Sequence, residues 1–572
     1  MAKLNAELVA AFNRLANLLE IKGENPFKIR AYRNAARTIE GLGRSVEEMV
    51  RAGEDLTELP GIGKDLAQKI KDFVETGRIE KLEELEREIP APLLELLSVE
   101  GLGPKRIRVL YENLGIKDLD QLRDAAQSGA IEKLPGFGPK IVETILKGTR
   151  LAKKEGRRFK WAVAEEYVED LLQYLNEAQG VEVIEVAGSF RRKKETVGDL
   201  DVLVVSEDWE LVTDHFVRYP HVKEVISKGK TRSTVILTPG IQVDLRSVPR
   251  QCYGAALAYF TGSKAHNIAI RTMGVKLGLK INEYGVFRGD ERIGGEEELD
   301  VYKAVGLPFI EPELRENSGE IEAAQAGRLP NLIRLEDIRG DLHCHSHYTD
   351  GKDTIWAIAT AAKALGYEYI AITDHSKRLT VTKGLDEKRL REQMEEIDQL
   401  NERLHGITIL KSIEVDILED GSLDLPDEVL RELDLVVGSI HHKFKLSQEA
   451  QTARVLKAMD NPHFTILGHP TGRLIGQREP YKINVQKVLE GAKERGCFLE
   501  LNAQPDRLDL NDVNLRLAKE IGVKIAISTD SHSIGTLAYM RYGVNQARRG
   551  WIEKGDCINT RSLPELKQLL KR

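Results

Sequence analysis

The sequence predicts a multidomain α+β and α/β protein. It should have a helical amino-terminal region, a domain with a mixed β-sheet, and a seven-stranded (β/α) barrel. Three observations predict this order. Gly-x-Gly turns recur within the first 150 residues, an Asp-x-Asp pair opens an apolar strand near residue 200, and seven strand-like runs after residue 340 are mostly separated by helical ones. A length of 572 residues suits three or four domains, and an apolar content of 41% supports ordinary globular cores.

The composition limits the kinds of partner and location. The formal net charge is −7, and residues 1–150 hold 24 Lys and Arg against 25 Asp and Glu. Any contact with DNA must therefore be local and geometric. The four cysteines form no C-x-x-C pair, which fits a reducing cytosol and predicts a cytoplasmic protein. The chain shows no secretory apolar core and no run of membrane-spanning length, so we expect no membrane partner.

The first 150 residues should be helical and should carry a repeated helix-hairpin-helix pattern. The Gly-x-Gly turns lie 40 and 35 residues apart, and each precedes a helical run. Glycines let a turn lie against a nucleic-acid backbone, while N–H groups at the start of a helix bind phosphate. One such turn is usually only a turn, but three in phase predict sequence-independent DNA binding at Gly61, Gly63, Gly101, Gly103, Gly136 and Gly138.

A group of carboxylates is expected on the central sheet. Asp199 and Asp201 precede the apolar run 202–205, so both should point to the same face of a strand. Asp244, in another strand-like run, offers a third carboxylate. Carboxylates that share a face are costly without a cation, and three could hold two Mg²⁺ ions for nucleotidyl transfer. The alternative is an Asp-rich turn beside a basic loop.

The segment before these carboxylates could bind phosphate. Gly188 lets the backbone approach a ligand closely, and Ser189 and nearby N–H groups could contact terminal phosphates. Arg192 could pair with the same phosphates through two hydrogen bonds.

The run Gly188-Ser189-Phe190-Arg191-Arg192 with Gly198-Asp199-x-Asp201 resembles the nucleotidyltransferase palm of family X DNA polymerases, the polymerase beta relatives. Residues 281–285 resemble that family's thumb. Lys264 departs from the family, which has an Asp near the incoming base at this position. The resemblance implies that an incoming nucleotide is bound by Gly188, Ser189, Arg192, Gly198, Tyr259, Phe260, Gly262, Lys264, Asn267 and Arg271.

Residues 24–85 resemble the small lyase domain of the same family. Lys69 aligns with the Schiff-base lysine, but positions that carry lysines in the family's 5′-phosphate pocket hold Thr57 and Asp65 here. The carboxylate at Asp65 would repel a 5′-phosphate. Lys69 is therefore either a lyase residue or a solvated helix lysine, and we expect weak or absent lyase activity.

The carboxyl-terminal region repeatedly places metal-binding residue types at the ends of strand-like runs. Ten of the 13 histidines lie within residues 341–572. Parallel α/β barrels place their chemistry at the carboxyl ends of their strands, and imidazoles mixed with carboxylates suit Zn²⁺, Mn²⁺ or Fe better than Mg²⁺ alone. A lone His at a strand end is usually structural, but repetition around a whole barrel predicts metal binding.

Residues 338–572 resemble the PHP domain, named for polymerases and histidinol phosphatases. The resemblance implies a metal hydroxide that attacks phosphate esters, with up to three Mn²⁺ or Zn²⁺-type ions. The nine metal-ligand positions of the family are filled here by His343, His345, Asp350, His375, Glu414, His441, His469, Asp530 and His532.

These patterns together predict the domain boundaries. Residues 311–338 are acidic, interrupted by proline and poor in apolar periodicity, so we expect a linker over residues 316–337. The expected order is a small lyase-like helical domain (1–90), a fingers-like helix-hairpin-helix domain (91–155), a palm (156–250), a thumb-like domain (251–315), the linker (316–337) and a PHP barrel (338–572).

Three functions are compatible with this organisation. The resemblance to bacterial-type family X polymerases implies a monomeric repair enzyme that fills short gaps. It would use dNTPs on gapped or primer–template DNA in the palm, and would act as a metal-dependent 3′–5′ exonuclease or phosphoesterase in the barrel. The second is a DNA-binding repair scaffold with only phosphoesterase activity, which the intact Asp199, Asp201 and Asp244 argue against. The third is a small-molecule phosphatase, which the hairpin repeats and the palm argue against.

Overall fold

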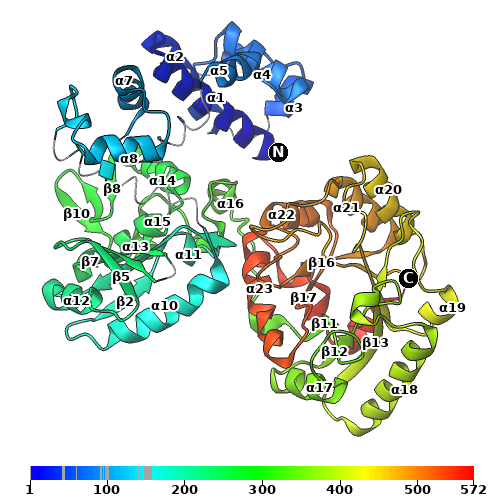
Figure 1. Cartoon of the computed structure of the whole chain (residues 1–572). Coiled ribbons are helices and arrows are strands. Elements are labelled where there is room, and N and C mark those ends of the chain that lie inside the picture. Colours follow the sequence, from blue (N-terminus) through cyan, green and yellow to red (C-terminus); the bar gives the residue numbers. More distant parts are fainter. Residues whose placement is uncertain are drawn as a thin grey trace. The chain divides into compact units, whose positions relative to one another are not determined.

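The computed structural model divides into two compact units, Met1–Arg158 and Phe159–Arg572 (Figure 1). The structure describes residues 2–40, 46–59, 61–89, 93, 96, 99, 102–138, 141–142, 145–146, 158–238 and 240–571.

The first unit is helical, as expected. Leu8, Phe12, Leu15 and Leu19 recur at helical spacing and are fully buried, so one face of the first helix forms the centre of an apolar cluster. A second cluster is built around Ile107 and its neighbours. The helices are α1 (Ala2–Lys22), α2 (Pro26–Glu40), α3 (Val46–Arg51), η1 (Leu56–Glu58), α4 (Lys64–Thr76), α5 (Glu80–Glu88), α7 (Pro104–Leu114), α8 (Leu119–Gln127) and η3 (Ile131–Lys133).

Glycines form the turns of the repeated pattern, and two of these turns precede the helices α4 and α7. Gly61 and Gly136 have φ of +78° and +86°, a conformation that costs glycine little. Gly63 and Gly103 cap α4 and α7 in extended conformations, and α7 then begins with a proline. The expected helix starts are therefore present at the first two repeats. Gly101 lies outside the described residues, whereas Gly138 follows the third turn.

The second unit begins with a five-stranded mixed sheet of order β2-β4-β7-β6-β5. β4 and β7 are parallel, and the other neighbours are antiparallel. Helix α10 (Trp161–Asn176) packs its apolar face on this sheet, and α12 (Trp209–Phe216) joins the same core. The strands are β2 (Val183–Val186), β4 (Asp199–Val205), β5 (Val222–Ser227), β6 (Ser233–Leu237) and β7 (Gln242–Val248), with β1 (Phe159–Lys160) paired to β3 (Thr196–Val197) beside them.

A smaller α+β part follows the mixed sheet. Its three strands form an antiparallel sheet of order β10-β9-β8, and its helices share one apolar cluster that includes Ile270, Ile281 and Tyr302. The elements are α13 (Tyr253–Thr261), α14 (Lys264–Lys276), β8 (Leu279–Asn282), β9 (Gly285–Arg288), β10 (Glu291–Gly294), α15 (Glu298–Ala304) and η5 (Pro312–Leu314).

The expectation of a linker over residues 316–337 is wrong. The segment contains α16 (Glu320–Gln325) and η6 (Leu335–Asp337), and Ile321 and Leu332 are buried in the preceding apolar cluster. The buried Glu320 also pairs with Nδ1 of His266, at 2.7 Å. Both helices are too short to show a helical repeat of apolar residues, so the periodicity of the sequence did not predict them.

The rest of the chain forms a nearly closed barrel, which confirms the predicted fold class. Its seven strands run parallel in sequence order, and a bridge from Cys344 to Ser531 joins the first strand to the segment after the last. The strands are β11 (Gly340–Cys344), β12 (Tyr369–Ile372), β13 (Thr408–Asp416), β14 (Leu435–Ser439), β15 (Ile466–Leu467), β16 (Phe498–Asn502) and β17 (Ile525–Ser528), as Figure 1 shows in part.

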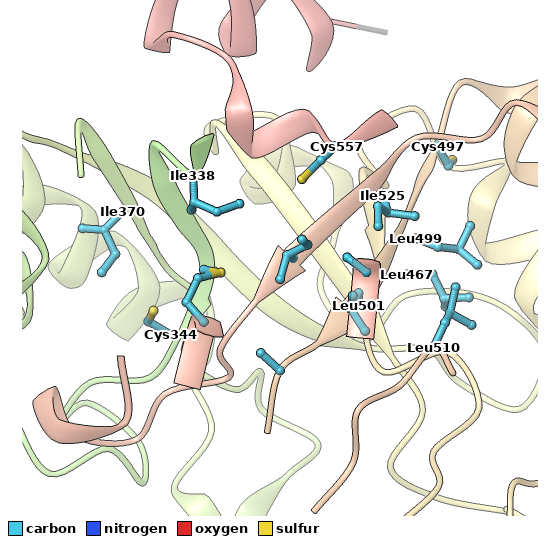
Figure 2. Close-up of a cluster of buried hydrophobic side chains, with 14 of the residues drawn as sticks. Ile338, Cys344, Ile370, Leu467, Cys497, Leu499, Leu501, Leu510, Ile525 and Cys557 are labelled. Carbon is cyan, nitrogen blue, oxygen red and sulfur yellow. The ribbon is translucent and has the colours of Figure 1, made fainter. Parts of the chain in front are cut away.

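Helices surround the barrel strands and bury their outward side chains. Figure 2 shows part of this core, where Ile370, Leu467, Leu499 and Ile525 come from different strands. All four cysteines are buried, and none of them forms a disulfide. The helices are η7 (Thr380–Thr382), α17 (Ile355–Ala364), α18 (Glu387–Arg403), α19 (Asp427–Leu430), α20 (Gln448–Met459), α21 (Val485–Arg495), α22 (Asp512–Ile521), η8 (Ile534–Tyr539), α23 (Met540–Arg549), η9 (Lys554–Asp556), η10 (Ile558–Thr560) and α24 (Leu563–Leu569).

No helix in the described part of the chain is both long and apolar enough to span a membrane.

Candidate active sites

Three carboxylates gather on strands β4 and β7. The parallel register places Asp201 opposite Asp244, and Asp199 lies two residues earlier on β4. Asp244 is only 3% exposed, whereas Asp199 faces solvent. Gly188 lies against this group: a Cβ atom there would approach Oδ2 of Asp201 to 2.9 Å. The chain thus needs a glycine at this point.

The carboxylates repel one another in a partly buried setting. Burial, followed by the Asp199 charge, raises the pKa of Asp201 to about 7, and Asp244 adds to the effect. The guanidinium of Arg246 opposes it, with Nε 3.7 Å from Oδ1 of Asp201. Arg246 also lies over the ring of Phe260, 4.1 Å from its centroid. Such unbalanced negative charge suits a site that binds cations.

The structure adds two residues to the site that the sequence did not single out. Nη2 of Arg232 donates to Oδ2 of Asp244 at 2.7 Å, and Oγ1 of Thr234 donates to Oδ1 at 2.6 Å. Thr234 is the cross-strand neighbour of Asp244 on β6. A pairing of strands 233–237 and 242–248 would have pointed to it, but the sequence alone did not specify that pairing.

The two arginines of the Gly-Ser-Phe-Arg-Arg run have different surroundings. Arg191 makes two 2.8 Å hydrogen bonds to the Glu298 carboxylate and a third to Oγ1 of Thr261, at 2.7 Å. It therefore joins the short helix α11 (Gly188–Arg191) to α13 and α15. Arg192 donates from Nε to Oε1 of Glu316 at 3.0 Å and from Nη1 to the carbonyl of Thr261.

The turn between α13 and α14 brings together most of the other predicted nucleotide-binding residues. The rings of Tyr259 and Phe260 are edge to face, with centroids 5.1 Å apart. Nδ2 of Asn267 donates to the carbonyl of Tyr259 at 2.6 Å. Gly262 lies beside Arg192, since a Cβ atom at Gly262 would be 3.2 Å from its Nη1. A pocket is lined by Tyr259, Asn267 and Arg271, among others.

The remaining predicted positions lie at the edges of this site. Ser189 is in α11, Gly198 lies between β3 and β4, and Lys264 is the exposed first residue of α14.

In the barrel, all nine predicted residues meet at the carboxyl ends of the strands. Nε2 of His469 is 2.9 Å from Oε1 of Glu414, which places it beside the other eight. Those eight form three overlapping groups whose possible ligand atoms lie within 4.8 Å of one another: His345, Asp350, His375 and His532; His343, His345 and Asp530; and His375, Glu414 and His441. Each group could hold a metal ion.

Buried atoms without hydrogen-bond partners fit this interpretation. In the described structure, Nδ1 of His345, Nδ1 of His375 and Oε2 of Glu414 are buried and make no hydrogen bond. The last two atoms lie 2.6 Å apart yet lack hydrogen-bond geometry. Buried polar atoms are normally paired, so three unpaired ligand atoms in one cluster fit coordination to cations.

The charges of the barrel site perturb one another strongly. Burial opposes protonation of His375, but Glu414 and Asp350 raise its pKa to about 10. Burial raises the pKa of Glu414, yet His441 and His375 hold it well below its ordinary value. His345 differs: burial, reinforced by neighbouring histidines, lowers its pKa to about 3. Strongly perturbed groups at one strand end are typical of functional sites.

A set of supporting residues orients the imidazoles, and the sequence analysis missed it. Glu500 contacts Nδ1 of His343 at 2.7 Å and accepts from the backbone N–H of His469 at 2.6 Å. Asp416 contacts Nδ1 of His441 at 2.6 Å. Glu500 lies on β16 and Asp416 is the last residue of β13. Acidic residues inside apolar strands are the signal that could have identified both.

In the first unit, Lys69 pairs with the carboxylate of Asp65, one turn earlier on α4. The lysine is thus already neutralised by the residue that replaces a cation of the lyase pocket. Its role as a lyase residue stays a prediction.

Family models cover most of the chain. They are a helix-hairpin-helix domain over residues 3–79, a SAM-like helix-hairpin-helix tandem over 93–150, a DNA polymerase beta palm over 158–253, a DNA polymerase beta thumb over 256–316 and a PHP domain over 341–504.

Known proteins resemble the chain in whole or in part. The chain is 40% identical to the DNA polymerase/3′-5′ exonuclease PolX of Bacillus subtilis (strain 168). The match extends over 570 residues and covers 99% of each of the two chains. A probable phosphatase of Thermoanaerobacter sp. (strain X514) is 30% identical over 242 residues, 40% of this chain and 94% of the phosphatase. DNA polymerase lambda of Arabidopsis thaliana is 27% identical over 349 residues, 54% of this chain and 62% of the polymerase. The chain belongs to the PolX family, the family X DNA polymerases whose palm and thumb are joined to a PHP domain.

Proposed function

We propose that this protein fills short gaps in DNA with its palm and degrades DNA from a 3′ end with its barrel. The observation that supports it is the presence of two separate clusters in one chain. One is a group of three carboxylates centred on the pair Asp201 and Asp244. The other is the group of imidazoles and carboxylates around Glu414. The first composition suits Mg²⁺, and the second suits Mn²⁺ or Zn²⁺-type ions.

In the palm, Asp199, Asp201 and Asp244 would hold two Mg²⁺ ions. Bound there, the ions would supply electrostatic stabilisation of the charge that develops during nucleotidyl transfer. Arg232 and Thr234 bind one carboxylate oxygen of Asp244 each, which fixes its orientation. We assign to Asp244 a part in removing the proton from the primer 3′-hydroxyl.

The predicted nucleotide contacts surround the α13–α14 turn. Ser189 and Arg192, flanked by Gly188 and Gly198, would bind the triphosphate, and Arg192 keeps a second terminal nitrogen that can donate to it. The aromatic pair that precedes Gly262 would pack against the sugar and disfavour a ribose 2′-hydroxyl.

The remaining contacts would involve the base pair. Asn267 and Arg271, which line one pocket, would face the minor groove of the nascent pair. Lys264 would reach the incoming base or a phosphate.

In the barrel, the nine clustered residues would hold up to three ions. The residues of this cluster would hold ions that supply Lewis-acid activation of water for phosphodiester hydrolysis. The protein contributes orientation: Glu500 and Asp416 bind the Nδ1 atoms of His343 and His441, so that their Nε2 atoms face the cluster. Buried second partners of this kind fix the tautomer of each ring.

The partners follow from these sites. Gapped or primer–template DNA would be bound without reading of sequence through the glycine turns of the first unit, and dNTPs would bind in the palm. We place a monomeric enzyme in the cytoplasm, whose reducing conditions suit cysteines that form no disulfide.

One assay tests the proposal against its alternatives. Full-length protein is incubated with a one-nucleotide gap, labelled on the primer, with and without dNTPs, in Mg²⁺ and then in Mn²⁺. Extension with dNTPs and shortening without them are expected. Shortening without any extension would favour the scaffold that keeps only phosphoesterase activity. Hydrolysis of a free phosphate monoester alone would favour a small-molecule phosphatase, the activity that the name of the Thermoanaerobacter relative suggests.

A further inference from the structure

Arg549, the last residue of the barrel helix α23, has its side chain buried against the palm. The side chain is 4% exposed. Its Nη1 donates to the backbone carbonyl of Arg192 at 2.8 Å and to Oε1 of Glu316 at 3.1 Å. Its Nη2 donates to Oδ2 of Asp512, at the start of α22, at 2.6 Å. One guanidinium therefore joins two barrel helices to the palm and to the segment that follows the thumb.

Glu316 is the acceptor that Arg549 shares with Arg192. The same Oε1 atom accepts from Nε of Arg192 at 3.0 Å. Arg192 is thus held twice through Arg549, once at its own carbonyl and once through the carboxylate that binds its side chain. Its remaining described hydrogen bond, to the carbonyl of Thr261, fixes it beside the turn at Gly262.

The charges of this group decide what Arg549 does for Arg192. Arg192 and Arg549 share the Glu316 carboxylate, and Arg549 also binds Asp512, so the loss of Arg549 would remove one positive charge from this group. Without Arg549, Glu316 would pair with Arg192 and with the more distant Lys194, whose Nζ is 3.9 Å from its Oε1, and the net positive charge beside the triphosphate would fall. All three side chains are largely buried, so such an imbalance is poorly screened by solvent.

A second barrel residue holds the same palm segment. Nη2 of Arg473 donates to Oε2 of Glu195 at 2.7 Å and also binds the carbonyl of Leu508. Arg473 follows the clustered residue His469 by four positions. The palm segment 192–195 is therefore bound by the barrel at both of its ends.

We propose that Arg549 is a positioning residue for the polymerase: through Glu316 and the carbonyl of Arg192, the PHP barrel holds the Arg192 guanidinium in place toward the incoming triphosphate. The inference rests on the proposed phosphate-binding role of Arg192. It gives the barrel a part in nucleotide addition that is independent of its own chemistry.

The test is the KM for a dNTP on a one-nucleotide gap, measured with full-length Arg549→Gln at saturating DNA. The KM should rise about tenfold, the loss expected for one charged hydrogen bond, while kcat falls less. Shortening of a 3′ end without dNTPs should stay within about twofold of the original rate. Arg548→Gln is the matched control: it removes the neighbouring guanidinium, which binds Glu313 and the carbonyl of Ile333, and should leave the KM unchanged.

A double-variant comparison separates positioning from general stability. Arg192→Ala alone should raise the KM, and adding Arg549→Gln to it should raise it no further. If the two effects multiply, or if Arg549→Gln alone leaves the KM unchanged while Arg192→Ala raises it, the inference is wrong. If Arg192→Ala itself has no effect, the proposed role of Arg192 fails instead.

A variant at the shared carboxylate covers a failure of Arg549→Gln to fold. Glu316→Gln keeps the shape of the acceptor and removes its charge. Any change in the KM for the dNTP that Glu316→Gln causes should be absent when Arg192 has already been replaced by alanine. An effect that persists there would overturn the inference.

Discussion

Asp201 and Asp244 lie opposite each other on adjacent parallel strands, in the same row of the central sheet. Asp244 is anchored by Arg232 and Thr234, whereas Asp201 is compensated by Arg246, 3.7 Å away, and more weakly by Arg232. The two carboxylates therefore differ in how easily they stay charged. Without a bound cation, Asp201 is the carboxylate of the pair whose charged form is less stable.

This instability predicts that Asp201→Asn stabilises the metal-free protein. The pKa of Asp201 is raised from 3.8 to about 7, so between these values the folded state binds more protons than the unfolded state. Stability then falls as pH rises through this window. Asparagine removes the effect, and at pH 8 the free energy of unfolding of the second unit should rise by about 1–3 kcal/mol.

Chemical unfolding at pH 4 and at pH 8, with EDTA, measures that gain. The gain in the free energy of unfolding should be larger at pH 8 than at pH 4. Saturating Mg²⁺ in place of EDTA should reduce this gain, because it stabilises the original protein. The exposed Asp199→Asn serves as the control with a smaller gain. A variant less stable than the original at pH 8 in EDTA would contradict the assignment.

The two activities should be separable by single substitutions. Asp199→Ala should abolish extension, because it removes one of three carboxylates, and should leave shortening of a 3′ end intact. His343→Ala should lower shortening by about a hundredfold or more and still fill gaps. Both variants are assayed on one labelled primer–template. The two-site description fails if His343→Ala still degrades normally or if Asp199→Ala does not degrade at all.

Glu500 should matter to the barrel although it is not among the nine clustered residues. Glu500→Gln weakens the acceptor of His343 and of the His469 N–H, so the imidazole loses its fixed orientation. Degradation should fall about 10–100-fold, with partial recovery at higher Mn²⁺. A Mn²⁺ titration of the rate measures this, and gap filling by the same variant is the control. A loss that no Mn²⁺ concentration relieves would argue for a different role.

The third glycine turn gives a prediction about DNA binding. Alanine at Gly136, where φ is +86°, strains the turn by about 1 kcal/mol, and the Kd for gapped DNA should rise about fivefold. Gly53→Ala is matched, with φ of +71° and open space for a Cβ atom, but lies outside the repeats. It should bind DNA normally. Equal losses of affinity for gapped DNA in both variants would show that the repeats are not part of the DNA-binding surface.

Lyase activity should be weak. The Asp65 carboxylate pairs with Lys69 and would repel a 5′-phosphate. Borohydride trapping on a 5′-deoxyribose-phosphate end should therefore be inefficient, and Asp65→Ala should increase it. Efficient trapping through Lys69 in the unaltered protein would show that this reading is wrong.

The sequence was sufficient where local patterns carry the information. Strand alternation placed Asp199 and Asp201 on one face, and strand ends placed His441 and His469 in the barrel cluster. It was insufficient where partners are distant. The different environments of Arg191 and Arg192 depend on contacts made more than 100 residues away, with Glu298 and Glu316.

Short helices are the other feature that the sequence did not predict. α16 spans six residues, too few for a periodic signal, and its burial depends on helices that precede it in the chain. Arg549 lies 357 residues from Arg192, and no spacing rule connects them.

The barrel is closed by its first strand and the segment after its last, through Cys344 and Ser531. During synthesis, Asp530 and His532 leave the ribosome after the entire palm and most of the barrel. A nascent or prematurely terminated chain can therefore fold its DNA-binding parts before it has the residues that complete the degrading cluster. A chain that ends before Asp530 would lack two of the nine residues that we propose hold the metal ions of the barrel.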